Sequence, residues 1–150
     1  MGNWLEGPAE PLPEGAWPGQ RLGLPADGPG SAASTGSRFL ALLLDLVAGG
    51  LIGALLFSLL DDPAPGLRST VATAGFALQV LVLQSLTGQS LGMRLVRIRV
   101  ARLAAPSGPP GFLAVAVRTA LLCLVVPAVL MDQDARGLHD KAGGTVVLRA

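Results

Sequence analysis

Hydrophobic positions in this chain gather in three long runs separated by short polar stretches. The first run covers residues 39–60 and its only charged residue is Asp45, whereas the second covers residues 69–87 and has no charge. About 20 mostly apolar residues in a helix cross a hydrocarbon core of ~30 Å, so both runs are predicted to span a membrane. The turn over residues 61–68 contains Pro63, Pro65 and Gly66, which break helices. The pattern therefore predicts an antiparallel helical hairpin.

The third run, residues 111–131, is interrupted by Arg118 and by Pro127. Counted from Arg118 onward, its apolar part has 13 residues, which is typical of a re-entrant or interfacial segment. We expect a third span, with a re-entrant segment as the alternative. The fold class predicted by the three runs is an all-α integral membrane protein with three apolar helical segments.

Two short stretches are rich in β-branched residues instead, and the first alternates with a period of two. Val96, Ile98 and Val100 alternate with arginines, and a second β-rich stretch follows near the end of the chain. A two-stranded pairing of 95–100 with 145–149 would satisfy both strands. This pairing requires both stretches to lie on one side of the membrane. A third run that crosses the membrane would separate them and prevent the pairing.

The first 36 residues differ in character from the rest. Proline and glycine are frequent there and follow no period, which is typical of a disordered segment. We therefore expect a disordered tail over 1–36, dispensable for insertion, and a membrane domain over 37–150. The tail has no apolar stretch behind a basic patch, as a secretory signal would. Trp4 and Trp17 would touch the membrane surface or bind a partner.

Composition supports a membrane location and excludes several functions. Hydrophobic residues make up 51% of the chain and charged residues 14%, against about 25% in soluble domains. The net charge of +1 argues against a nucleic-acid partner. With Cys123 as the one cysteine and His139 as the one histidine, no disulfide, metal site or cofactor is expected. No spacing typical of a catalytic site occurs, so we expect that the chain is not an enzyme.

The basic residues indicate an orientation. The loop over 88–110 contains four arginines and no acid, whereas the turn over 61–68 has only Arg68 as a base. By the positive-inside rule, the long loop and the N-terminus are cytoplasmic, which predicts a multi-pass protein of the inner membrane. A third crossing would put four basic residues outside, whereas a re-entrant third segment would leave Arg68 alone outside. The division with a re-entrant third segment follows the positive-inside rule better.

Charged residues inside the apolar runs are candidates for function, because each costs about 2.5–3.5 kcal/mol on insertion scales. Helical rise puts Asp45, Gln79 and Arg118 at similar depths of roughly 10–12 Å below the cytoplasmic surface. We therefore predict that Asp45 pairs with Arg118 or, failing that, with Arg38. Such a layer is either an ion or proton site or an ion pair that fixes the register of the helices.

Small residues in the first run suggest where the hairpin packs. Gly49 and Gly53 have the spacing of a GxxxG motif, which lets two helix backbones approach closely. Glycine is common in membrane helices, so the motif alone is a weak signal.

Three stretches of the chain resemble the RDD family of bacterial membrane proteins over about residues 36–150. The first is Arg38 followed by Asp45, the second is GQSLGMRLVRIRV at 88–100, and the third is RGLHDKAGGTVV at 136–147. The resemblance implies that Arg38, Asp45 and Asp140 are the arginine and aspartates of the family name, and Arg118 matches an arginine that often opens the last segment. The loop positions that match are Gly88, Gln89, Leu91, Gly92 and Arg94, while Ser90 and Met93 depart from the pattern. The matching positions near the end are Arg136, His139, Asp140, Gly144 and Thr145.

The resemblance and the buried charges leave two function classes open. One is a transporter or ion-coupled transport component that uses the buried Asp/Arg layer and is homo-oligomeric, because three helices cannot enclose a path. The other is a non-catalytic accessory or assembly subunit of a larger membrane complex. In both, the bilayer is the first partner.

Overall fold

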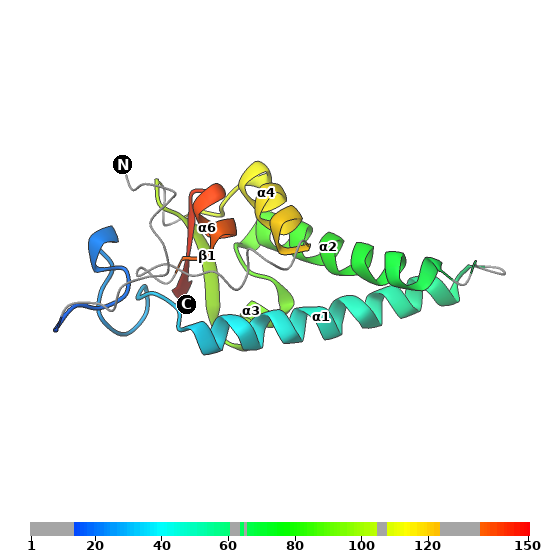
Figure 1. Cartoon of the computed structure of the whole chain (residues 1–150), viewed down its shortest axis with the longest axis horizontal. Helices are drawn as coiled ribbons and strands as arrows, with labels where there is room; N and C mark the ends of the chain where they lie inside the picture. The colour runs from blue at the N-terminus through cyan, green and yellow to red at the C-terminus, as the bar shows by residue number, and fades with distance from the viewer. Residues whose placement is uncertain (1–13, 61–63, 65, 105–107, 124–135) are drawn as a thin grey trace.

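The computed structural model describes residues 14–60, 64, 66–104, 108–123 and 136–150. The helices are η1 (Gln20–Leu22), α1 (Thr35–Ser58), α2 (Leu67–Thr87), α3 (Leu91–Leu95), α4 (Phe112–Cys123) and α6 (Leu138–Ala142). The strands are β1 (Ile98–Arg102) and β2 (Thr145–Arg149). The long α1–α2 hairpin points away from a compact end that holds the sheet, α3, α4 and α6 (Figure 1).

The expected hairpin is present, and both of its helices are long and apolar enough to cross a membrane. Ser34 caps the start of α1, and its side chain accepts a hydrogen bond from the backbone N–H of Ser37 at 3.2 Å. α2 ends at Gly88, which has a left-handed φ of 73°. This stop directs the chain from the hairpin into α3 and the sheet.

The two helices meet along small residues of α1, as the Gly49–Gly53 spacing predicts. A Cβ added at Gly49 would lie 2.5 Å from Cα of Phe76, and one at Gly53 would lie 2.5 Å from Cα of Ala72. From the opposite side, a Cβ at Gly75 would lie 2.9 Å from the carbonyl oxygen of Gly49. The backbones are therefore in direct contact, and no side chain fits between them.

We expect Gly49→Val to destabilise the hairpin by roughly 1–3 kcal/mol, because the added carbons overlap α2. Gly50→Val is the matched control, since a Cβ at Gly50 meets nothing within 4 Å. Thermal unfolding of the purified variants in one detergent measures the difference. Equal melting temperatures for the two variants would show that the helices are not packed at Gly49.

The third apolar run begins as α4, whose 12 residues have a length of about 18 Å. That is too short to cross a hydrocarbon core by itself. The remainder of the run, residues 124–131, lies outside the described residues. Both alternatives for this run, a third crossing and a re-entrant segment, therefore stay predictions.

The two β-rich stretches pair as expected, and the pair is antiparallel, with Val100 opposite Val147 and Arg102 opposite Thr145. β1 starts later than predicted, because Leu95 is the last residue of α3 and residues 96–97 form a turn before the strand. One face of the sheet packs with α1 and α3. The buried residues of this cluster are Ala33, Ala41, Met93, Ile98, Val100 and Val147.

The prediction of a disordered segment through residue 36 is wrong for the part that borders α1. The N–H groups of Gly30 and Ala33 each donate to a β2 carbonyl at 2.9 Å, and Ala32 forms a bridge with Leu148. Leu22 and Leu24 pack over the second apolar face of the sheet. Proline and glycine content predicted disorder here, but an open strand edge and an uncovered apolar face hold the segment in place. Residues 1–13 of the tail, with Trp4, lie outside the described residues.

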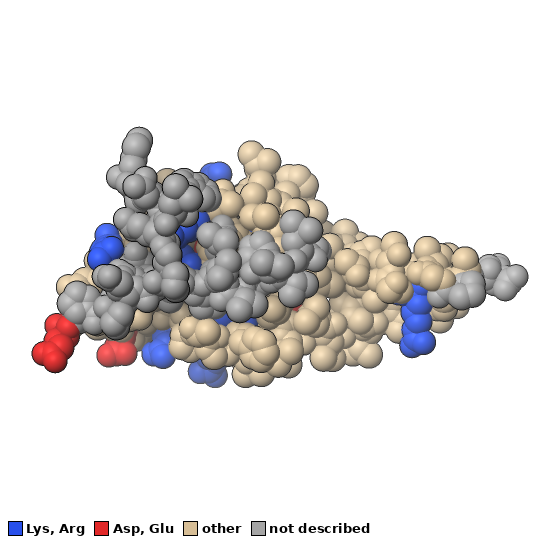
Figure 2. Space-filling view, viewed as in Figure 1, with Lys and Arg blue, Asp and Glu red and all other residues tan. Residues whose placement is uncertain are grey.

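Charge is distributed unevenly over the surface. Charged side chains gather around the sheet, whereas most of the hairpin surface in view is uncharged (Figure 2). The hairpin also exposes large apolar side chains. They include Val47, Leu51, Leu55, Leu78, Val82 and Leu86. In water this surface would be unfavourable, so it is suited to lipid or to neighbouring helices.

Candidate functional site

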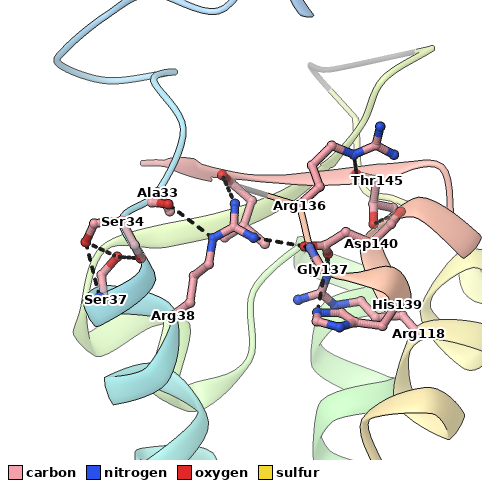
Figure 3. Close-up of polar contacts among 11 residues, drawn as sticks. Ala33, Ser34, Ser37, Arg38, Arg118, Arg136, Gly137, His139, Asp140 and Thr145 are labelled. Atoms are coloured by element: carbon pink, nitrogen blue, oxygen red, sulfur yellow. Dashed lines mark hydrogen bonds and ion pairs between the residues drawn. The ribbon is translucent and has the colours of Figure 1, made fainter. Parts of the chain in front are cut away.

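One buried charge cluster centres on Asp140, which has no exposed surface. Nη1 of Arg38 lies 2.9 Å from Oδ2 of Asp140, and Nη1 of Arg118 forms an ion pair with Oδ1 (Figure 3). The backbone N–H of Gly137 also donates to Oδ2, at 3.3 Å. Two arginines and a backbone donor therefore share one carboxylate, which we call the Asp140 centre.

Four elements meet at the Asp140 centre. Arg38 lies in the first turns of α1, where its Nε donates to the Ala33 carbonyl at 3.1 Å and its Nη2 to the Val147 carbonyl at 3.2 Å. Arg118 comes from α4 and Asp140 from α6, and these two helices pack against each other. The centre thus ties the start of α1 and β2 to both later helices.

The other residues matched near the C-terminus support Asp140. Arg136 Nε donates to the Thr145 carbonyl at 3.2 Å, and Thr145 Oγ1 donates to the Asp140 carbonyl at 3.3 Å. His139 is buried with its Nε2 3.7 Å from Oδ1 of Asp140. Gly144 has a left-handed φ of 60° and begins the approach to β2. These residues hold α6 against the strand.

A second buried centre surrounds Asp45, which is 3% exposed. Gln79 Nε2 donates to Oδ1 at 3.1 Å, the N–H of Gly92 donates to Oδ1 at 2.8 Å, and Ser90 Oγ donates to Oδ2. The carboxylate therefore takes three neutral donors, one from α2 and two from the α3 turn. We call this the Asp45 centre.

The loop residues matched to the family build the turn that faces Asp45. Ser90 caps α3 by accepting from the N–H of Met93 at 3.3 Å, and Gln89 Nε2 donates to the Ile98 carbonyl at 3.0 Å. The Gly88 carbonyl accepts from the N–H of Val100 at 2.7 Å. The two remaining matched positions, Leu91 and Arg94, are exposed.

The predicted ion pair between Asp45 and an arginine is wrong. Among the described residues, both Arg118 and Arg38 pair with Asp140, and Asp45 has neutral donors only. Asp45 and Gln79 do meet, as their depth predicts. Depth along a helix gives height but not direction around the axis, so it could not tell which acid each arginine faces.

The geometry agrees with the comparison to known families. The model of the RDD family matches residues 32–144, more than half of the chain. This chain belongs to the RDD family. The match begins before residue 37, the expected start of the domain, and takes in Ala33, whose carbonyl accepts from Arg38. No curated protein and no solved structure matches the chain.

Sequence reasoning missed two partners in this RDD protein. Ser90 departs from the loop pattern of the family, yet its hydroxyl donates a hydrogen bond to the Asp45 carboxylate. A serine just before a short helix is recognisable as an N-cap, so the sequence could have placed Ser90 at the start of α3. Hydropathy gave no indication that Asp140 pairs with both arginines, because Asp140 lies outside every apolar run.

Two surface hollows of the described residues, one between the start of α1 and the sheet and one along α2, are not lined by Asp45 or Asp140. In the same residues, no group of three or more His, Cys, Asp or Glu side chains could hold a metal ion. Both carboxylates are buried, and their hydrogen bonds and ion pairs come from groups of the chain itself. The arrangement is suited to holding elements together.

Proposed function

We propose that this RDD protein is a non-catalytic integral protein of the inner membrane that acts as an accessory or assembly subunit of a larger complex or homo-oligomer. The observation that supports this best is that, in the part of the chain that the structure describes, the buried carboxylates of Asp45 and Asp140 take their partners from the chain itself. Asp140 holds Arg38 and Arg118, and Asp45 holds three neutral donors. A carrier or an enzyme needs a polar group presented to its substrate. Here the polar groups fasten the compact end to the hairpin.

The pairing of β1 with β2 supports two crossings. β1 lies before α4 and β2 after it, and hydrogen bonds join them along the whole register. Two strands cannot pair through a bilayer, which supports the proposal that both lie on one side and that the third apolar run does not cross the membrane. Arg68 is then the one base on the outer side. Nine basic residues fall on the cytoplasmic side, at positions 21, 38, 94, 97, 99, 102, 136, 141 and 149.

The hairpin supports a role in assembly. Only 22% of the most apolar window of α1 and 28% of that of α2 is buried inside the chain. Two helices cannot enclose a path, and they leave most of their apolar surface to lipid or to other helices. A second copy or a larger membrane protein would cover part of it.

One observation favours the second candidate, an ion-coupled transport component. The side-chain oxygens of Gln79, Gln84 and Thr119 are buried and have no hydrogen-bond partner. Unpaired polar atoms in an interior are suited to water, and water next to Asp45 would give a proton or cation a place to bind. An oligomer would have to complete the path.

Flux through vesicles separates the two functions. The purified chain is reconstituted in phosphatidylethanolamine and phosphatidylglycerol vesicles, and proton and sodium fluxes are followed with ion-sensitive dyes under an imposed gradient. We expect flux no greater than in empty vesicles, and chemical crosslinking in cells should yield a species larger than one chain. Flux that is lost in Asp45→Asn and kept in Asp27→Asn, which changes an exposed carboxylate, would establish transport instead.

A further inference from the structure

A groove of about 380 Å³ opens between the start of α1 and the end of the sheet. Its lining combines charged, hydroxyl and apolar groups. Among the lining residues are Arg97, Arg149, Ser34, Ser37, Val96 and Ile98. The groove lies apart from the Asp45 and Asp140 centres, and neither carboxylate lines it.

Two arginines give the groove a positive charge. Arg97 and Arg149 are exposed, and within the described residues neither guanidinium has a hydrogen bond or an ion pair. The backbone holds them close together, because Arg149 pairs with Ile98 in the sheet and the N–H of Ala150 donates to the Arg97 carbonyl at 2.9 Å. Two guanidinium groups on adjacent backbones suit an anion with several oxygens, such as a phosphate.

Arg97 also has an unfavourable backbone conformation. Its φ of 55° is the one positive value among the non-glycine residues that the structure describes. An L-residue with a side chain is disfavoured in this region, where glycine or asparagine is usual. A long cation kept at a strained and exposed position points to a use for its charge.

We infer that this groove binds the headgroup of an anionic phospholipid in the cytoplasmic leaflet. The inference rests on the proposed orientation, which puts the sheet on the cytoplasmic side. Apolar side chains accompany the charge: Leu95, two residues before Arg97, is 73% exposed, and Phe39, two residues after Ser37, is 61% exposed. A free phosphate would make no favourable contact with this apolar surface, whereas a lipid has a phosphate for the arginines and acyl chains for the apolar side chains.

Lipid binding by the full chain tests the inference. The protein, purified in detergent, is titrated with phosphatidylglycerol or phosphatidylcholine of the same acyl chains, and bound lipid is counted by native mass spectrometry. We expect phosphatidylglycerol to bind roughly tenfold more tightly, because the two arginines attract its net charge and repel choline. The double variant Arg97→Gln with Arg149→Gln should lose this preference. The control is Arg94→Gln with Arg102→Gln, which removes the same charge from exposed arginines outside the groove, and it should keep the preference.

Three results would overturn the inference. These are equal binding of the two lipids, equal loss of preference in both double variants, and displacement of phosphatidylglycerol by inorganic phosphate, which would make the groove a site for the free anion. Arg97→Gly adds a second readout, because glycine accepts the positive φ. We expect it to melt at a higher temperature than the parent and to bind phosphatidylglycerol more weakly; unchanged lipid binding would also contradict the inference. None of these measurements uses the flux or crosslinking results, so failure of the lipid inference can be told apart from failure of the proposed function.

Discussion

Replacing Asp140 with asparagine is expected to remove most of the stability of this RDD protein. The substitution keeps the shape of the side chain but leaves Arg38 and Arg118 buried without a counter-charge. Breaking a buried ion pair in this way costs roughly 3–5 kcal/mol, out of a total of about 5–15 kcal/mol for a typical domain. Two guanidinium groups depend on this one carboxylate, so we expect the upper part of that range.

The amount of folded protein in the membrane fraction and the melting temperature in detergent measure this effect. Asp27→Asn is the matched control, because Asp27 is exposed and the same substitution there should change stability by less than about 0.5 kcal/mol. An Asp140→Asn protein that accumulates and melts like the parent would show that the Asp140 centre does not hold the helices together.

Gly92→Ala is expected to have the second largest effect. A Cβ at Gly92 would overlap the carbonyl oxygen of Ala41 on α1 and lie 3.0 Å from Cγ of Asp45. To make room, α3 must move away from α1, which weakens the bonds from the Gly92 N–H and the Ser90 hydroxyl to the Asp45 carboxylate. Overpacking and a poorly satisfied buried charge together cost roughly 2–5 kcal/mol.

A second glycine gives an effect of the opposite sign. Gly36 lies in the first turn of α1, and a Cβ there meets nothing within 4 Å. Gly36→Ala should therefore stabilise the chain slightly, by up to about 1 kcal/mol, because alanine favours helix. Unfolding curves for the two variants measured side by side should move in opposite directions. Similar curves would mean that α3 is not packed on α1 at Gly92.

Local sequence pattern was enough to predict the helical hairpin and the pairing of the two short strands. The hairpin follows from two apolar runs with a proline-rich turn between them, and the sheet follows from two short β-rich stretches, the first of them alternating. The close approach at Gly49 agrees with the GxxxG spacing of Gly49 and Gly53, although that motif alone is a weak signal. These features depend on local pattern, which a sequence displays directly.

The candidate site was less accessible to sequence reasoning. The depth argument brought Asp45 and Gln79 together correctly, but it assigned the arginines to the wrong acid. Their actual partner, Asp140, lies in a short helix far along the chain, and only tertiary packing brings it to α1 and α4. The composition of the segment before α1 wrongly predicted disorder for a similar reason. The exposed edge of β2 orders a stretch that would be disordered in isolation.

Thiol labelling tests most directly whether the sheet holds both later segments on one side of the membrane. Single cysteines are placed at Ala64 in the turn, at Ala104 after β1 and at Ala150 after β2, each in a Cys123→Ala background. Spheroplasts are treated with an impermeant thiol reagent, before and after permeabilisation. We expect Ala64→Cys to react in intact spheroplasts and the other two to react only after permeabilisation. Reaction of Ala150→Cys from outside would put β2 across the membrane from β1 and would contradict the paired sheet, the two crossings and the cytoplasmic compact end together.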